Sequence, residues 1–172
     1  DILKLFDETQ WEEEKKICMM GKQFIWVEWK HFMAVADHYG FKYKKDIYDK
    51  IKDVYPIDAF TFFSMFGFAE VHAIDISTYE GADILFDLNS EGKLPDNLCE
   101  GFDLVIDGGT LEHVFNIHNA INNMSSMVRE KGFIYHAVPL TGYVNHGFYS
   151  ISPTFFLDYY GSDFRIKELN IR

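Results

Sequence analysis

Three acidic side chains in this chain each follow a short apolar run, a placement that favours a ligand site. The runs, each given with the aspartate that ends it, are 71–74 with Asp75, 84–86 with Asp87, and 102–106 with Asp107. Such runs are typical of strands in a parallel sheet that is covered on both faces. Because ligands of these sheets bind outside the carboxyl ends of the strands, we expect the three carboxylates to face one crevice.

Glycines stand at two of the turns that would line this crevice. Gly108 and Gly109 follow Asp107 directly, and Gly21 ends another apolar run, 16–20. Glycine permits a tight turn and lets a ligand approach the main chain closely. We therefore expect these three glycines to belong to the same binding site as the aspartates.

Histidines near the same edge could act as a general base, because imidazole gains and loses a proton near neutral pH. His113 comes soon after the glycine turn, and His146 lies in a loop after the run 133–138. Either could instead pack and hydrogen-bond locally. His136 lies inside that run, where a core histidine with satisfied hydrogen bonds is the more common case.

The loop around His146 is rich in polar groups that could bind a substrate. Asn145, Tyr149 and Ser150 are its other polar side chains, and a loop held over the crevice would suit an acceptor site. The alternative is that its glycines serve the turn and its aromatic side chains pack below.

The order of patterns predicts an α/β fold with a doubly wound, mostly parallel sheet. The strand-like runs are 16–20, 71–74, 84–86, 102–106 and 133–138. Helices are expected from about 110 to 129 and from 153 to about 160, and a last strand over 164–171. We expect a single domain, 1–172, with a helical insertion at 22–57 that forms a lid, a substrate wall or a packing element. Asp58 could cap a further helix over 59–65.

The composition excludes some partners. A net charge of −11 argues against nucleic acid, whose phosphates require a basic face. No apolar run approaches the ~20 residues of a membrane span. The two cysteines lie far apart without metal-ligand spacing, which favours a reduced, cytoplasmic setting. We expect a small-molecule ligand, and the sequence leaves the oligomeric state open.

The stretch Phe-Asp-Leu-Val-Ile-Asp-Gly-Gly-Thr-Leu-Glu-His, residues 102–113, resembles the fourth strand and following helix of class I S-adenosylmethionine-dependent methyltransferases. The resemblance implies a Rossmann-like fold that binds S-adenosylmethionine. Asp75 would then hydrogen-bond the ribose hydroxyls, and Asp87 would bind the adenine amino group. Ile76 and Leu88 would enclose the adenine ring. The implied ligands of the methionine half are Asp107, Gly108 and Gly109.

The chain departs from that family in two places. The glycine-rich turn G-x-G-x-G is reduced to Gly21, although Lys22 could pair with the carboxylate of the cofactor. Of the antiparallel hairpin that usually ends the sheet, 164–171 matches one strand only, so the hairpin could be incomplete. A non-catalytic binding or scaffold domain is therefore the alternative to a methyltransferase. A nicotinamide dehydrogenase would need G-x-G-x-x-G at the first turn, which is absent.

The sequence also contains candidate ligands for a metal ion. Some methyltransferases of the ubiquinone-pathway and small-RNA 2′-O-methylating types hold a metal at Glu-x-x-Glu-His, and Glu112 and His113 match its last two residues. The first glutamate falls at Gly109, so a downstream histidine such as His146 would have to replace it. We expect no divalent metal, with these residues as the alternative. The expected activity is methyl transfer to a small polar acceptor such as a sugar hydroxyl.

Overall fold

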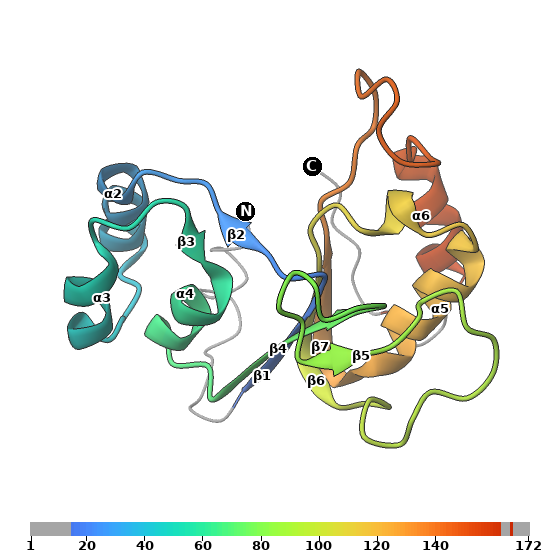
Figure 1. Cartoon of the computed structure of the whole chain (residues 1–172), viewed down its shortest axis with the longest axis horizontal. Helices are drawn as coiled ribbons and strands as arrows, with labels where there is room; N and C mark the ends of the chain where they lie inside the picture. Colours follow the sequence, from blue (N-terminus) through green and yellow to red (C-terminus); the bar gives the residue numbers. More distant parts are fainter. Residues whose placement is uncertain (1–14, 163–165, 167–172) are drawn as a thin grey trace.

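The computed structural model describes residues 15–162 and residue 166. Its main sheet has five parallel strands in the order β5-β4-β1-β6-β7 (Figure 1). These strands are β1 (Lys16–Met20), β4 (Glu70–Asp75), β5 (Ile84–Leu85), β6 (Phe102–Asp107) and β7 (Val128–His136). The predicted α/β fold with a mostly parallel sheet is confirmed at this level.

The sheet is buried on both faces, which explains why its central strands read as continuous apolar runs. Side chains of β1 alternate between two hydrophobic clusters: Ile17 and Met19 join one, Cys18 and Met20 the other, and all four are fully buried. Helices of the insertion cover the first face. The second face is covered largely by α5 (Ile117–Met127).

The insertion between β1 and β4 is closed at its base by a small antiparallel ribbon. Its elements are β2 (Phe24–Ile25), α2 (Trp29–Tyr39), α3 (Lys45–Ile51) and β3 (Ile57–Asp58), and α4 (Ala59–Met65) follows directly. The insertion predicted as helical over 22–57 therefore begins with a strand and not a helix, because Phe24 pairs with Asp58 in the ribbon. The cap is confirmed, since the Asp58 carboxylate accepts a hydrogen bond from the Thr61 amide.

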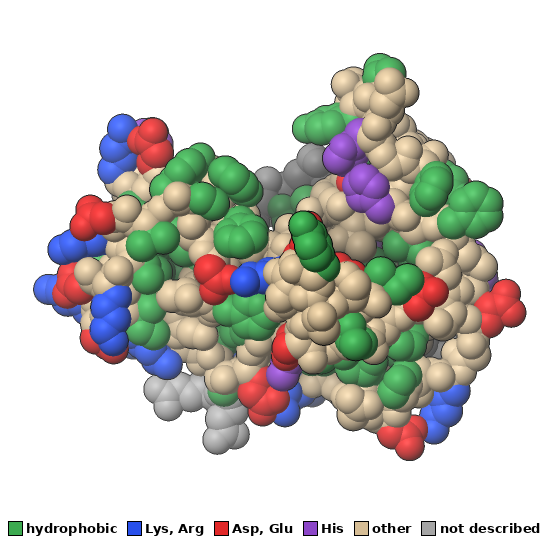
Figure 2. All heavy atoms as spheres, in the orientation of Figure 1, with side chains coloured by type: hydrophobic (Ala, Val, Ile, Leu, Met, Phe, Trp, Pro, Cys, Tyr) green, Lys and Arg blue, Asp and Glu red, His purple; other side chains and the backbone are tan. Residues whose placement is uncertain are grey.

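The insertion stands beside the loop that follows β7, with a hollow between them. In the view of Figure 1 the helices of the insertion lie at the left, and the loop after β7 rises at the upper right. Figure 2 shows the hollow in space-filling form, with histidine side chains on the side of the β7 loop.

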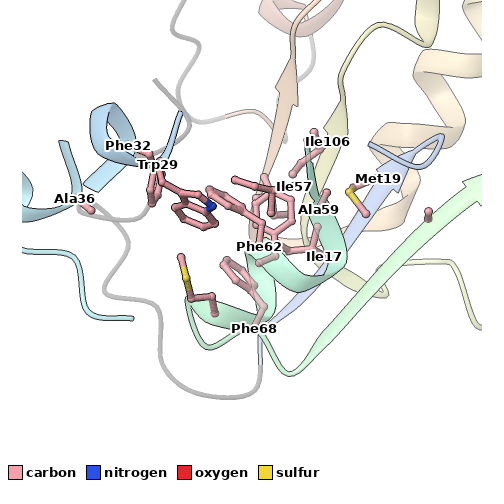
Figure 3. Packing of buried hydrophobic residues seen from close by; sticks show 14 of the residues in the cluster. Ile17, Met19, Trp29, Phe32, Ala36, Ile57, Ala59, Phe62, Phe68 and Ile106 are labelled. Carbon is pink, nitrogen blue, oxygen red and sulfur yellow. The ribbon is translucent and has the colours of Figure 1, made fainter. Parts of the chain in front are cut away.

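Aromatic packing joins the insertion to the sheet in one hydrophobic core (Figure 3). The rings of Phe32 and Phe62 meet edge to face with centroids 5.0 Å apart, and Phe32 meets Trp29 in the same way. The indole nitrogen of Trp29 donates to the carbonyl of Ile51, which ties α2 to the end of α3. The side of the insertion that faces the sheet therefore packs against it and belongs to the same hydrophobic core.

The helix predicted over 110–129 is interrupted. A short 3₁₀ helix, Leu111–His113, is followed by extended backbone at Val114, and α5 begins only at Ile117. The Asn116 side chain caps α5 by accepting from the Asn119 amide. The pattern of apolar residues gave no sign of this break, because apolar side chains are buried before it, at Leu111, and after it, at Ile121 and Met124.

The strand predicted over 133–138 begins earlier than expected. The helix ends at Met127, and β7 starts at Val128, where it pairs with Phe102 before its register shifts. Lys131 has a φ of 65° within this irregular stretch. A Cβ atom at position 132 would lie 2.9 Å from the Asp103 carbonyl oxygen, so this close approach of two strands requires glycine.

The remaining predictions vary in outcome. Helix α6 (Pro153–Gly161) is confirmed, with a Ser152 cap that accepts from Thr154. The connections 76–83 and 86–101 contain turns and no helix. The strand predicted over 164–171, and with it the incomplete hairpin, lies outside the described residues except for residue 166. No helix of the described part is long and apolar enough to cross a membrane.

The fold predicts different reactivity of the two thiols. Burial in β1, with a smaller effect of Asp83, raises the pKa of Cys18 to about 12, whereas Cys99 is exposed. Since the thiolate is the reactive form, an aromatic disulfide reagent near pH 8 should modify Cys99 rapidly and Cys18 only after unfolding. Absorbance of the released thiol, measured with and without denaturant, tests this. Rapid modification of Cys18 in the native protein would contradict the buried position of β1.

Candidate functional site

The turns after β1 and β6 meet where the strand order reverses, the usual ligand position in open α/β sheets. The Thr110 hydroxyl donates to the Met20 carbonyl over 2.6 Å and joins the two turns. A Cβ placed on Gly21 would lie 3.4 Å from Thr110 Oγ1 and 4.0 Å from Asp75 Oδ2. The sheet thus brings together Gly21, Asp75 and the turn after β6, as the sequence predicted.

Asp75 ends β4 with one carboxylate oxygen engaged and the other open. Its Oδ1 accepts from the Ser77 amide over 3.0 Å, while Oδ2 is the atom that faces Gly21. No hydrogen bond to Oδ2 is present within the described part of the chain. Ile76, next to it, has 70% of its surface exposed. This corner can therefore accept a hydrogen bond from a ligand that also covers Ile76.

Gln23 occupies the space between the two turns. Its side-chain amide donates to the Met20 carbonyl, and a Cβ on Gly108 would lie only 2.8 Å from Gln23 Oε1. Lys22 points elsewhere, with Nζ 3.5 Å from Asp58 Oδ1. Lys22 would have to leave Asp58 before it could pair with the carboxylate of a cofactor, as the sequence predicted. No pattern in the sequence pointed to Gln23, because the position of its side chain depends on the distant glycine turn.

Asparagine side chains hold the segment after β5 in place, and part of this segment is buried. Asp87 Oδ1 accepts from both the amide and the side chain of Asn89. Leu88 is 6% exposed and packs in the core, so of the two residues predicted to enclose a ring only Ile76 offers a free surface. Asn123 of α5 donates to the carbonyls of Leu88 and Ser90 and fixes the segment.

Asp107 is fully buried and its carboxylate is engaged within the protein. Oδ1 accepts from the amides of Thr110 and Leu111, and Oδ2 lies 2.8 Å from His136 Nδ1. His136 Nε2 in turn lies 2.8 Å from the Tyr160 hydroxyl. The carboxylate of Asp107 therefore stabilises the turn. Of the three residues predicted to bind the methionine half, Gly108 is exposed and Gly109 is partly exposed. His136 is a core histidine with partners on both ring nitrogens.

A second group of polar side chains gathers beside the turn. Glu112 lies in the 3₁₀ helix with its side chain 1% exposed, and half-exposed His113 and His146 flank it. Glu112 Oε1 is 3.5 Å from His146 Nε2 and 3.9 Å from His113 Nε2, and the two imidazole centroids are 4.7 Å apart. Both histidines predicted as bases are thus brought together around one carboxylate.

The loop after β7 is pinned to the backbone of Glu112. The carbonyl of Glu112 accepts hydrogen bonds from the amides of Phe148 and Tyr149. Asn145 and Gly147 adopt positive φ values of 61° and 70°, which turn the loop sharply around His146. Of the predicted acceptor-binding residues, Tyr149 donates its hydroxyl to the Phe115 carbonyl. Ser150, like Asn145, is exposed.

No family model matches the chain, and neither does any curated protein or solved structure in the comparisons. The functional interpretation therefore depends on the geometry of this edge and on the sequence resemblance.

Asn123 gives a test of how the edge is positioned. Replacing Asn123 with Ala leaves the carbonyls of Leu88 and Ser90 without their donor, and we expect the free energy of unfolding to fall by about 1–3 kcal/mol. Denaturant unfolding followed by circular dichroism measures this. Asn97→Ala, at an exposed position in the same connection, is the matched control. Equal stability of the two variants would show that Asn123 does not hold the segment.

Proposed function

We propose that the chain binds S-adenosylmethionine at the carboxyl edge of the sheet and transfers its methyl group to a small polar acceptor. The observation that carries this proposal is the convergence of Gly21, Asp75 and Thr110 at the point where the strand order reverses. The sequence of β4, β5, β6 and their turns resembles class I methyltransferases at the same positions.

The open oxygen of Asp75 supports an adenosine ligand. A carboxylate that accepts from both ribose hydroxyls makes charge-assisted hydrogen bonds, which are stronger than neutral ones. Ile76 is exposed beside it and offers an apolar surface to the adenine ring. The turn at Gly108 and Gly109 presents main chain to the methionine half, and Asp87 remains the predicted partner of the adenine amino group.

The acceptor would lie against the loop after β7. Methyl transfer moves the methyl group from the sulfonium to an acceptor oxygen, so the acceptor proton must leave to a base and S-adenosylhomocysteine is released. His146 and His113 are the imidazoles on this side, and Asn145 and Ser150 are exposed polar groups near them. This polarity favours a hydroxylated acceptor such as a sugar or sugar derivative.

Gln23 is the observation that favours the alternative, a non-catalytic binding or scaffold domain. Its side chain contacts Gly108 in the space between the two turns, where the methionine half would be expected. The contacting atoms are the far end of a flexible side chain, so rotation of Gln23 would open the space. The two functions therefore differ in whether Gln23 moves aside when cofactor is added.

Asp75 provides the direct test of the proposal. Calorimetric titration of the full chain with S-adenosylhomocysteine should show saturable binding, and Asp75→Ala should weaken it by about 1.5–3 kcal/mol, or roughly 10- to 150-fold in Kd. Glu91→Ala, an exposed acidic position in the connection after β5, should bind as the wild type does. Binding that is unchanged in Asp75→Ala would remove Asp75 from the site, and the absence of binding in the wild type would favour the alternative.

Gln23→Ala separates a flexible from a blocked site. If Gln23 rotates away on binding, removing its side chain should leave the Kd for S-adenosylhomocysteine equal or lower, because one hydrogen bond to Met20 no longer has to break. The same calorimetric titration measures this. Weaker binding in Gln23→Ala would instead mean that the glutamine contacts the cofactor.

A further inference from the structure

We infer that Glu112, His113 and His146 form a binding site for a divalent transition-metal ion. One donor atom from each of the three residues lies within 4.8 Å of the others. Glu112 and His113 come from the turn after β6, and His146 comes from the loop after β7. This inference does not rest on the proposed methyl transfer, because it is argued from the geometry of these three residues alone and none of them belongs to the Gly21 and Asp75 corner. His113 and His146 are also the candidate bases of that reaction.

The carboxylate of Glu112 is buried with one oxygen unpartnered. Oε2 has no hydrogen-bond partner among the described residues, although the side chain is only 1% exposed. An unsatisfied buried acceptor costs about 1–3 kcal/mol, more when it is charged, so native proteins rarely keep one without a reason. A cation bound at the carboxylate would remove this penalty.

The spacing of the donor atoms suits an ion better than direct hydrogen bonds. The distances of 3.5 and 3.9 Å from Glu112 Oε1 to the two histidine Nε2 atoms exceed the ~2.7–3.2 Å of N–H···O hydrogen bonds. Ligands about 2.0–2.2 Å from a tetrahedral ion lie about 3.4 Å from one another. Small rotations of the half-exposed His113 and His146 rings would complete this geometry.

The loop that carries His146 is built against Glu112. Two amides, of Phe148 and Tyr149, donate to the Glu112 carbonyl, and a Cβ on Gly147 would lie 2.8 Å from that same oxygen. Glycine with a φ of 70° at this position lets the loop close over the 3₁₀ helix. These contacts hold the loop with His146 next to the Glu112 carboxylate. Little further ordering of the loop would therefore be needed when a metal ion binds.

The donor set selects the class of metal. Two imidazoles and one carboxylate suit Zn²⁺, Co²⁺, Ni²⁺ and Fe²⁺, whereas Mg²⁺ and Ca²⁺ prefer oxygen donors. Three protein ligands leave at least one coordination position open on the solvent side, as in catalytic rather than structural zinc sites. The site would thus hold a borderline transition metal that can still bind a hydroxyl, a carboxylate or water from outside.

Metal titration of the full chain tests the inference. After treatment with a chelator, calorimetry should show saturable binding of about one Zn²⁺ per chain and no comparable binding of Mg²⁺. Co²⁺ should give visible absorption bands from coordination by nitrogen and oxygen. His146→Ala and Glu112→Gln should each weaken Zn²⁺ binding more than about tenfold, because each removes one of three ligands.

His38→Ala is the matched control, since His38 is an exposed histidine on α2 outside the cluster. Its Zn²⁺ affinity should equal that of the wild type, and circular dichroism should show the native spectrum for every variant used. Because His146 is half-exposed on a loop, its variant remains informative if Glu112→Gln unfolds. The inference is overturned if the wild type does not saturate, if Mg²⁺ binds as tightly as Zn²⁺, or if His146→Ala binds like His38→Ala. All these titrations omit S-adenosylhomocysteine, so their outcome is separate from that of the cofactor experiment.

Discussion

The buried carboxylate of Asp107 is the constraint on which the carboxyl edge of this protein depends. It sits at the end of the central strand β6 with no exposure to solvent. Taking a carboxylate out of water costs several kcal/mol unless its oxygens are satisfied, so the surrounding backbone must supply donors. The amides of Thr110 and Leu111 and the ring of His136 do so, which fixes the turn after β6.

The same constraint reaches three neighbouring elements. Thr110, placed by Asp107, bonds the carbonyl of Met20 and couples the turn to β1. His136 extends the chain of hydrogen bonds to Tyr160 and so to α6. The 3₁₀ helix that follows the turn presents Glu112, whose carbonyl holds the loop after β7. Both candidate sites, the Asp75 corner and the Glu112 cluster, therefore adjoin the same turn.

The sequence predicted the features that local chemistry determines. Apolar runs located all five strands of the main sheet, and Asp58 was identified as a helix cap because its side chain acts on an amide three residues away. The break before α5 was not predicted. It is stabilised in part by the Asn116 amide, which donates to the side chain of Asn89 in a distant connection. Periodicity in a single segment carries no information about such a contact.

In the candidate sites, too, the features set by the parallel sheet were predicted and those that depend on tertiary packing were not. The parallel sheet explains why Asp75 and Gly21 were correctly predicted to lie at one edge. The carboxyl ends of its strands all lie at that edge. Gln23 and the Asp107–His136–Tyr160 chain were not foreseen, since each depends on tertiary packing. His136 was expected to be a satisfied core histidine, and its two partners agree with that expectation.

The two roles open to His113 and His146 require different protonation of the ring nitrogen that faces Glu112. A general base of the Ser-His-Asp type would carry a proton on Nε2, donate it toward Glu112, and take the acceptor proton at Nδ1. A metal ligand needs the Nε2 lone pair free and its proton on Nδ1. Donation from one Nε2 to Oε1 would still leave Glu112 Oε2 buried and unpartnered, whereas an ion can be bound by both carboxylate oxygens. Coordination thus accounts for one observation that the base does not. If the two histidines hold an ion through Nε2, they would orient it beside the acceptor site, and a different side chain would have to accept the acceptor proton.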